Sequence, residues 1–456
     1  MAFTQDFFTS RRNFNDGTTR IGDLDRIWYD STTKTLRISD GVTPGGIAIG
    51  IAINDEIHVG DIIVSSNTDK YLNPKYLLAD GGIYLQSAYP ELFAVLGLPA
   101  YTPNTLMDTP AILPPGAASG AAMSSDGTYF AVATGAPPFV TIYKETDGIY
   151  VKLADPAILP PGAANGTSMS GDGVYLTVGT GAPLYITNYQ RTGDEFIKLD
   201  APAVSPPAAA AATAYSDDSA YMAVTYGAPP YVTIYNNVAG TYTALTTPAT
   251  TPPGAASGVA FDGDGTYMVV LYGTPPYLTI YKRTGNTYTA LPTPSVVPTG
   301  APSGASFTSN GVYLAVSHPA LPYLTIYKRD GDIFTHIDNP TDMPSAAPAG
   351  VAFTADGMFM SVIYGAPPFI NFYRRVGDTF VKQPDLASPP TGAATTFAFA
   401  RGGSYIGLVN APPPYMSSYV SILPFDTATE FMLPSPISIS SSSFTFEVNN
   451  YIKAKP

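Results

Sequence analysis

Short runs of apolar and β-branched residues alternate with Gly, Pro and Asp breaks along most of this chain. In residues 119–153, SGAAMSSDGTYFAVATGAPPFVTIYKETDGIYVKL, four such runs are separated by Asp-Gly, Gly-Ala-Pro-Pro and Asp-Gly. Runs of this length between turn residues are typical of β-strands. The pattern predicts strands at about 119–124, 128–134, 139–145 and 149–153.

This pattern recurs with a period of 46 residues and without an insertion. Two aromatic series keep the step: Tyr129, Tyr175, Tyr221, Tyr267, Tyr313, Phe359 and Tyr405, and then Tyr143, Tyr189, Tyr235, Tyr281, Tyr327, Tyr373 and Tyr419. A single four-stranded blade cannot bury both of its faces, whereas a closed ring of blades can. The repeat therefore predicts an all-β fold, a seven-bladed β-propeller with four strands per blade.

The ends of the repeat predict how the ring closes. Residues 105–120, TLMDTPAILPPGAASG, resemble KLADPAILPPGAANG at 152–166, so the chain enters the ring with the tail of an outer strand. The seventh unit loses its outer-strand pattern around 424–430. We expect the entering segment to pair with the last blade and supply its missing strand.

The repeat also sorts the connections onto two faces. In an up-and-down blade the second-to-third connection and the blade-to-blade connection share one face. Sequences such as GAPPF and PAILPPGAA therefore gather on a Pro, Ala and aromatic face, and turns such as SSDGT and KRTGN on a polar, charged one.

One repeat position varies where its neighbours do not, and all of its residues are aromatic or able to hydrogen bond. These candidate ligand-binding residues are Thr134, Thr180, Tyr226, Tyr272, His318, Tyr364 and Asn410. We expect them around the central mouth of the apolar face, where rings could stack on sugars while polar atoms bond hydroxyls. The alternative is that the Pro-rich loop is only a stiff turn that resists strand addition, with drift at an exposed strand end.

The net charge of the chain argues against two classes of binding partner. The chain has 22 Lys and Arg against 35 Asp and Glu, a net charge of −13, which repels nucleic acid and anionic lipid alike. It has no cysteine, which excludes disulfides and thiolate metal sites. No apolar stretch approaches a membrane span, and the start of the chain lacks signal-peptide order.

Catalytic and metal-binding patterns are missing from the sequence. His58, His318 and His336 have no metal-ligand spacing, and Asp262 and Asp264 lack the later glutamate of a calcium loop. No GxSxG motif occurs, and the charged residues of the repeats follow polar turns instead of converging at a mouth. We expect no catalytic residues, no cofactor and no metal, and therefore no enzyme.

Residues 18–50 contain the only tryptophan, Trp28, in WYDSTTKTLRI, which predicts a β-hairpin around Thr32 to Lys34. The DGxTPGG ending that follows is formed by Asp40, Gly41, Thr43, Pro44, Gly45 and Gly46. This segment resembles the small amino-terminal β-domain of phage virion proteins of the major-tropism-determinant type. The resemblance implies a trimeric virion-attachment domain at 1–54, with Trp28, Asp40, Gly41 and Pro44 as candidate attachment residues.

Residues 60–97 resemble the phage tail-collar domain. They contain its LLxDG motif, with Ala79 in place of the usual cysteine, and its YPELF motif at 89–93. The collar's FxLPD and YIKA pieces match 431–434 and 451–454, after the seventh repeat, although Ser435 replaces the aspartate. The resemblance implies a collar-like domain split between 55–100 and 424–456, with the propeller inserted at 101–423, because a propeller's ends lie close together.

These features together predict a structural protein of a tailed-phage virion, a homotrimeric fibre or spike assembled in the host cytoplasm. Its propeller would adhere to the host surface, possibly to a polysaccharide, and would bind neither nucleic acid nor membrane. The alternative is a purely architectural tail, baseplate or capsid-decorating protein that contacts other virion proteins and no receptor.

Overall fold

The computed structural model describes residues 105–355, 357–400, 403, 405–410 and 415–420, together with Val42 and ten short strands outside the repeats. The chain forms two compact units, Thr102–Pro424 and a second unit made of 1–101 and 425–456.

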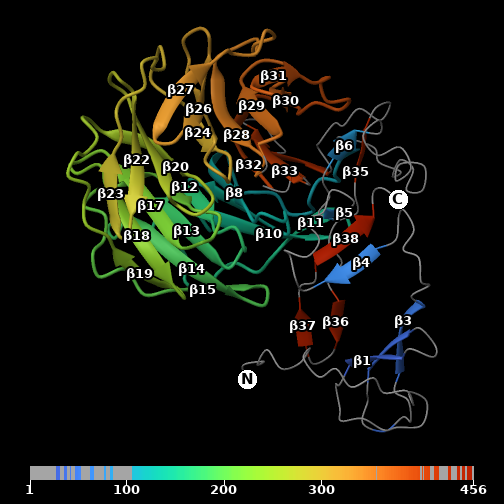
Figure 1. Ribbon diagram of the computed structural model, residues 1–456. Helices are drawn as coiled ribbons and strands as arrows, with labels where there is room; N and C mark the ends of the chain where they lie inside the picture. Colours follow the sequence, from blue (N-terminus) through green and yellow to red (C-terminus); the bar gives the residue numbers. More distant parts are fainter. Residues whose placement is uncertain are drawn as a thin grey trace. The chain divides into compact units, whose positions relative to one another are not determined.

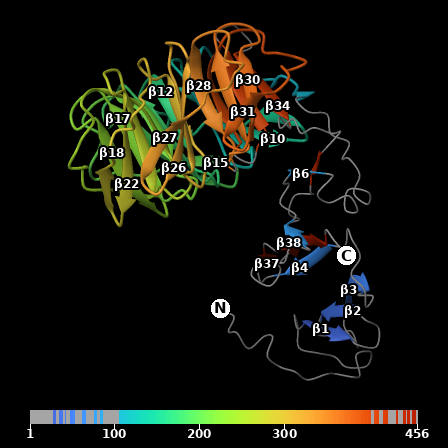
Figure 2. The ribbon, with the colours of Figure 1, turned by 45° about the horizontal axis from the view of Figure 1, so that its top comes forward.

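Seven four-stranded antiparallel sheets form a propeller, as the repeat predicts (Figure 1). The first, innermost strands are β8 (Ala118–Met123), β12 (Ala164–Met169), β16 (Ala210–Tyr215), β20 (Ala256–Phe261), β24 (Gly304–Phe307), β28 (Pro348–Phe353) and β32 (Ala394–Phe399). The second strands are β9 (Tyr129–Thr134), β13 (Tyr175–Thr180), β17 (Tyr221–Tyr226), β21 (Tyr267–Tyr272), β25 (Tyr313–Ser317), β29 (Phe359–Tyr364) and β33 (Tyr405–Asn410). The third strands are β10 (Val140–Thr146), β14 (Ile186–Thr192), β18 (Val232–Val238), β22 (Leu278–Thr284), β26 (Leu324–Asp330), β30 (Ile370–Val376) and β34 (Met416–Val420). The outer strands are β11 (Ile149–Lys152), β15 (Glu195–Lys198), β19 (Thr241–Ala244), β23 (Thr287–Ala290), β27 (Ile333–Ile337), β31 (Thr379–Lys382) and β7 (Thr105–Leu106). The blades follow one another in sequence order around the ring (Figure 2).

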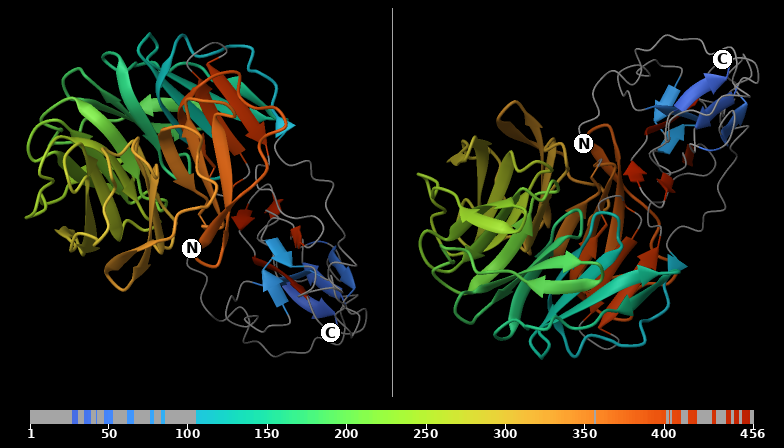
Figure 3. Two further views of the ribbon diagram at one scale, coloured as in Figure 1. Left: turned by 90° about the horizontal axis from the view of Figure 1, so that it is seen from above. Right: turned by 90° about the horizontal axis from the view of Figure 1, so that it is seen from below.

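The ring closes in the predicted way. The outer strand of the last blade is β7, which pairs antiparallel with β34 through Leu106 opposite Tyr419 and Thr105 opposite Val420. Figure 3 shows the cyan start of the ring beside its red-orange end in both views. This pairing ties the two ends of the repeat region together and confirms the expected closure.

The hydrophobic core lies between neighbouring blades. Each of the seven buried clusters of the described residues combines side chains of two adjacent blades, including one between the last and the first. The largest fully buried side chains are all tyrosines. Tyrosine suits this position because its ring fills the space between sheets while its hydroxyl reaches a polar partner.

The third-strand tyrosines attach each blade to the linker that enters it. The Tyr143 hydroxyl donates a hydrogen bond to the Ile112 carbonyl, 31 residues earlier, at 3.1 Å. The same bond recurs in the other six blades, at 2.8–3.0 Å, from Tyr189, Tyr235, Tyr281, Tyr327, Tyr373 and Tyr419. This explains why the second aromatic series contains only tyrosine, since phenylalanine could not make the bond.

The first strands of neighbouring blades approach closely at the centre. A Cβ atom on Gly120 would lie only 2.8 Å from Gly166 Cα in the next blade, closer than real Cβ atoms come to backbone. Glycine is therefore required at this position, where the inner strands of the first two blades pack directly against each other.

The second unit contains short antiparallel pairs. β1 (Ile27–Asp30), β2 (Thr35–Ile38) and β3 (Ile47–Ala52) form one sheet, in which β1 and β2 make the predicted hairpin and Trp28 lies opposite Arg37. Asp40, Gly41 and Pro44 lie outside the described residues.

Two pairings in this unit join segments that flank the propeller in the sequence. β38 (Asn449–Lys453) pairs with both β4 (Ile62–Ser65) and β5 (Tyr76–Leu78), and β35 (Glu430–Met432) pairs with β6 (Ile83–Leu85). β36 (Ile439–Ser441) and β37 (Phe444–Phe446) form a further hairpin.

Candidate ligand-binding face

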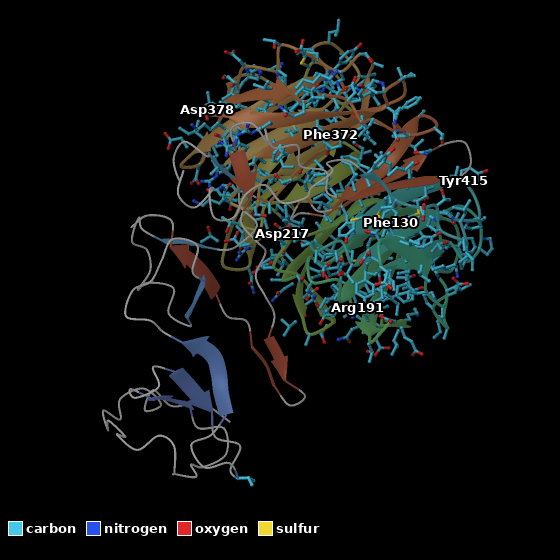
Figure 4. All side chains as sticks on the ribbon, turned by 90° about the vertical axis from the view of Figure 1, so that its right-hand side faces the viewer. Phe130, Arg191, Asp217, Phe372, Asp378 and Tyr415 are labelled. Carbon is cyan, nitrogen blue, oxygen red and sulfur yellow. The ribbon has the colours of Figure 1, made fainter. Side chains whose placement is uncertain are left out.

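The antiparallel blades give the propeller two chemically different faces. The loop face carries the connections from second to third strands and the linkers between blades; the hairpin face carries the other two connections of each blade. Tyr415, from a loop, lies at the edge of the propeller away from Asp217 and Asp378, which come from turns (Figure 4).

The seven candidate residues at the ends of the second strands are buried, which corrects the expectation that they ring an open mouth. Thr134, Thr180, Tyr226, Tyr272, His318, Tyr364 and Asn410 are each no more than 1% exposed. The reason is their position in the sheet, because each lies between a first strand and a third strand of its own blade. Thr134 pairs with Ala118 on one side, and its N–H donates to the Phe139 carbonyl on the other.

Each of these seven side chains makes a hydrogen bond inside the blade, although the amide oxygen of Asn410 is buried without a partner. The larger side chains reach the residue seven positions later on the third strand; Tyr226 and Thr233, for example, share a bond of 2.8 Å. The same pairing joins Tyr272 to Thr279, His318 to Thr325, Tyr364 to Asn371 and Asn410 to Ser417. The two threonines are too short to reach, so each donates to a carbonyl of its own loop.

Burial moves the pKa values of four of these residues further from neutral pH. Desolvation raises the pKa of the Tyr226 and Tyr272 phenols and lowers the pKa of His318. It raises the pKa of Tyr364 to about 12. All four side chains are therefore uncharged at pH 7, and they support the loops from below without facing solvent.

The residues that the loop face does present are aromatic in every blade. This aromatic series closes the seven loops and consists of Phe139, Tyr185, Tyr231, Tyr277, Tyr323, Phe369 and Tyr415. Each of these side chains is half-buried. Each residue also has a positive φ, between 57° and 73°, a conformation that bulky L-residues adopt rarely. Placing an aromatic residue in this region costs about 1–2 kcal/mol, so the blades retain an aromatic side chain at a backbone position suited to glycine.

Main-chain hydrogen bonds fix these loops. The Tyr277 N–H donates to the Thr274 carbonyl at 2.7 Å, and the Tyr272 N–H donates to the Tyr277 carbonyl at 3.1 Å. Equivalent pairs occur in the first six blades. The aromatic side chains are therefore held on closed, bonded loops and do not depend on a ligand for their position.

A second series lies at the centre of the loop face, at the start of the inner strands. Between Ala118 and Gly120 the register of β8 against β9 shifts, so Ser119 is the extra residue of a β-bulge. Five other inner strands have the same bulge, and in the remaining blade Ser303 directly precedes β24. This bulge series consists of Ser119, Asn165, Ala211, Ser257, Ser303, Ala349 and Thr395. All are exposed except Ala349, which is half-exposed, and five carry a hydroxyl or an amide.

The described loops and linkers of this face contain no Lys or Arg. Their charged residues are Asp108, Asp155, Asp200, Asp338, Asp342 and Asp385. The nearest lysines end outer strands, where Lys152 pairs with Asp155 at 2.6 Å and Lys382 with Asp385 at 3.0 Å, while Lys198 is exposed. The centre of the face is thus uncharged, and its periphery is weakly acidic.

The hairpin face uses its charges to join blades. The Tyr267 hydroxyl donates to Asp332 at 2.7 Å, Lys282 pairs with Asp332 at 2.7 Å, and the Arg329 guanidinium lies 4.4 Å from the Tyr267 ring. We call this four-residue arrangement a clasp. Two more clasps occur, at Tyr129, Lys144, Arg191 and Asp194 and at Tyr313, Lys328, Arg375 and Asp378. Hydrogen bonds from the lysine and the tyrosine hold the pKa of each of these aspartates below its usual value.

A cavity of about 170 Å³ opens among the ends of the inner strands on the hairpin face. Its lining includes Met123, Tyr215, Phe353 and Asp217. The Ser309 hydroxyl donates a hydrogen bond to the Asp217 carboxylate. No group of three His, Asp or Glu side chains that could bind a metal occurs among the described residues, and within the same residues no helix could span a membrane.

The sequence contained evidence for the aromatic series, because an aromatic residue occurs at this position in all seven repeats. The prediction of ligand-binding residues rests instead on the more variable position, 134 and its equivalents, because variation at a strand end is typical of recognition. The polar residues seven positions later indicated internal pairing instead. The bulge series had no comparable evidence, because a bulge depends on how two strands pair.

Comparison with known proteins identifies the fold of this protein but not its family. No protein-family model and no curated protein matches the sequence. Many solved chains are similar in structure, among them hydrazine synthase from Kuenenia stuttgartiensis, with a TM-score of 0.52 and 11% identity over 70% of this chain and 99% of that one. At this identity the likeness shows the β-propeller fold and carries no activity across. The protein is a seven-bladed β-propeller protein with an additional unit of short β-strands.

Proposed function

We propose that this protein is an adhesin of a tailed-phage virion that binds the host surface through the loop face of its propeller. The observation that carries the proposal is the aromatic series, which is half-buried at positive φ in all seven blades. Retaining a bulky ring at seven costly backbone positions is reasonable if the ring contacts a ligand, because aromatic side chains supply large contact area at low entropic cost.

The virion part of the proposal rests on the resemblance of the flanking segments to phage attachment and collar domains. In this proposal the protein is a homotrimer in the virion, assembled in the host cytoplasm and attached to other tail, baseplate or capsid proteins. It has no catalytic role and binds no nucleic acid. Three propellers with seven similar loops each would compensate for weak single sites through multivalency.

The test is binding of the full-length protein, displayed on beads, to intact bacterial cells of the host range. The variant Tyr231→Leu/Tyr277→Leu/Tyr323→Leu removes three neighbouring rings and keeps apolar bulk. We expect it to lower cell binding at least about tenfold, as expected for loss of hot-spot aromatics. The control variant, Val238→Ala/Ile333→Ala/Val376→Ala, removes exposed apolar side chains from the hairpin face and should bind normally.

The architectural alternative has its own supporting observation. Ile112, Ile158 and Val204, from three consecutive linkers on the loop face, are 57–59% exposed. Exposed apolar groups of this kind often mark protein–protein contacts. If wild-type beads bind no cells, while the protein assembles into particles and the leucine variant fails to assemble, the architectural role replaces adhesion.

A further inference from the structure

We propose that the centre of the loop face binds uncharged saccharide units, which the bulge series hydrogen bonds and the aromatic series stacks against. This inference rests on the proposed adhesion function and specifies its ligand class.

The bulges turn polar side chains toward solvent where a regular strand would not. Six of the seven inner strands place one extra residue at the same point, next to the loop face. Bulges are over-represented next to functional sites, where they redirect a side chain. A purely structural bulge would accept any small residue, yet five of the seven positions carry a hydroxyl or an amide.

Contacts with the main chain orient these polar groups. Asn165 Nδ2 donates to the Ala210 carbonyl at 2.9 Å, and Thr395 Oγ1 donates to the Val409 carbonyl at 3.2 Å. A hydroxyl that donates keeps lone pairs, and an amide keeps its oxygen, so such groups can still accept hydrogen bonds from ligand hydroxyls. Preorganised acceptors lower the entropic cost of binding.

The combination of oriented polar groups with aromatic rings matches the chemistry of sugars. A pyranose has apolar C–H faces, which pack against rings, and hydroxyls at its edge, which need hydrogen-bond partners. The loop face supplies both kinds of group in each of several blades, from the start of an inner strand and the end of a loop. A purely apolar partner would leave the bulge hydroxyls without partners.

The charges favour an uncharged ligand. Phosphate, sulfate and carboxylate groups on glycans are normally bound by Arg or Lys. The described loops and linkers of this face have neither, and their six charged residues are aspartates. At the centre of the face an anionic glycan would lose solvation without finding a cationic partner, because the nearest lysines end outer strands at the periphery. Binding should therefore depend little on ionic strength.

The placement of the seven sites determines how the ligand lies. The rings and the bulges recur once in each blade around the face, so a ligand that contacts several of them lies across the face. Repeated sites around the face then suit a repeating polymer, since several weak contacts can be made by one chain.

The experiment is a glycan array probed with the full-length protein. It carries neutral polysaccharides (dextran, mannan, galactan) and anionic ones (hyaluronan, alginate, polysialic acid). The test variant is Ser119→Ala/Asn165→Ala/Ser257→Ala. The control variant, Thr146→Ala/Thr192→Ala/Thr284→Ala, removes exposed hydroxyls from the hairpin face. Thermal unfolding of both variants checks that the propeller remains intact.

We expect binding to at least one neutral polysaccharide, unchanged between about 0.05 M and about 0.5 M salt. The test variant should bind it about tenfold more weakly or worse, with the control variant unchanged, because each lost hydrogen bond costs about two- to tenfold. Binding only to anionic members, or cell binding with no retention on any polysaccharide, overturns the inference and leaves adhesion standing. Absence of both cell and glycan binding overturns the proposed function as well.

Discussion

The two faces of the propeller use the same repeat in different ways. On the hairpin face, tyrosines, lysines and aspartates of adjacent blades bond to one another, as Tyr267, Lys282 and Asp332 do. On the loop face, hydrogen bonds close the main chain, while the aromatic side chains at the loop ends remain half-exposed. A repeated residue is therefore evidence for recognition only where its side chain is not already bonded within the fold.

The two faces differ in this way only if the linkers of the loop face are held in place. The largest expected effect on their attachment comes from substituting Tyr327. Tyr327 is fully buried, and its hydroxyl donates to the Val296 carbonyl at 3.0 Å. Tyr327→Ala should lower the free energy of unfolding by about 3–5 kcal/mol, as large-to-small core changes do. Tyr327→Phe, which removes only the hydroxyl, should cost about 1 kcal/mol.

Denaturant unfolding monitored by tyrosine fluorescence would measure both changes. Equal losses for the two variants would mean that the hydrogen bond, and not the packing of the ring, provides most of the stabilisation. A negligible loss for Tyr327→Ala would show that the linker is held by other contacts.

On the hairpin face, Asp262 is a carboxylate at a turn position where five of the other six blades carry a hydroxyl. Ser124 is one of them, and its Oγ donates to Asp126 at 2.5 Å. Asp262 is 3% exposed, and burial raises its pKa from 3.8 to about 7 despite a hydrogen bond from the Tyr267 N–H. The charge of Asp264 acts in the same direction as burial. The folded protein therefore binds this proton more tightly than the unfolded chain.

The stability that this proton provides is fully present below about pH 4 and is lost as the pH rises to about 7. Asp262→Ser introduces the hydroxyl that five other blades carry and should stabilise the protein by about 4 kcal/mol at pH 8, with little effect at pH 4. Unfolding free energies of both proteins at the two pH values would measure this. An equal change at both would assign the effect to packing instead of charge.

The clasps of the hairpin face should contribute least to the free energy of unfolding, although they join adjacent blades by charged hydrogen bonds. Asp332 is about half exposed, and solvent screens its interactions. A double-mutant cycle of Tyr267→Phe and Asp332→Asn should give a coupling below about 1 kcal/mol that weakens in high salt. A larger coupling free energy that does not depend on salt would mean that these contacts between blades stabilise the hairpin face substantially.

The sequence was enough to predict the blades because every element repeats seven times, so local evidence for each strand and turn is multiplied. The 46-residue period, the four strands, the closing role of residues 105–106 and the two chemically different faces all followed from linear pattern. The third-strand tyrosines were also visible as a series, although their bonds to linkers 31 residues earlier were not.

Whether each side chain is buried or exposed was decided by the tertiary structure. Residue 134 and its equivalents end a strand in the sequence, but a strand end is buried when the neighbouring strands extend beyond it and bond its polar atom. The bulge series is the reverse case, since residues inside a predicted strand become exposed through a register shift between two strands. Linear pattern reports which residues recur, whereas pairing between strands determines which of them reach solvent.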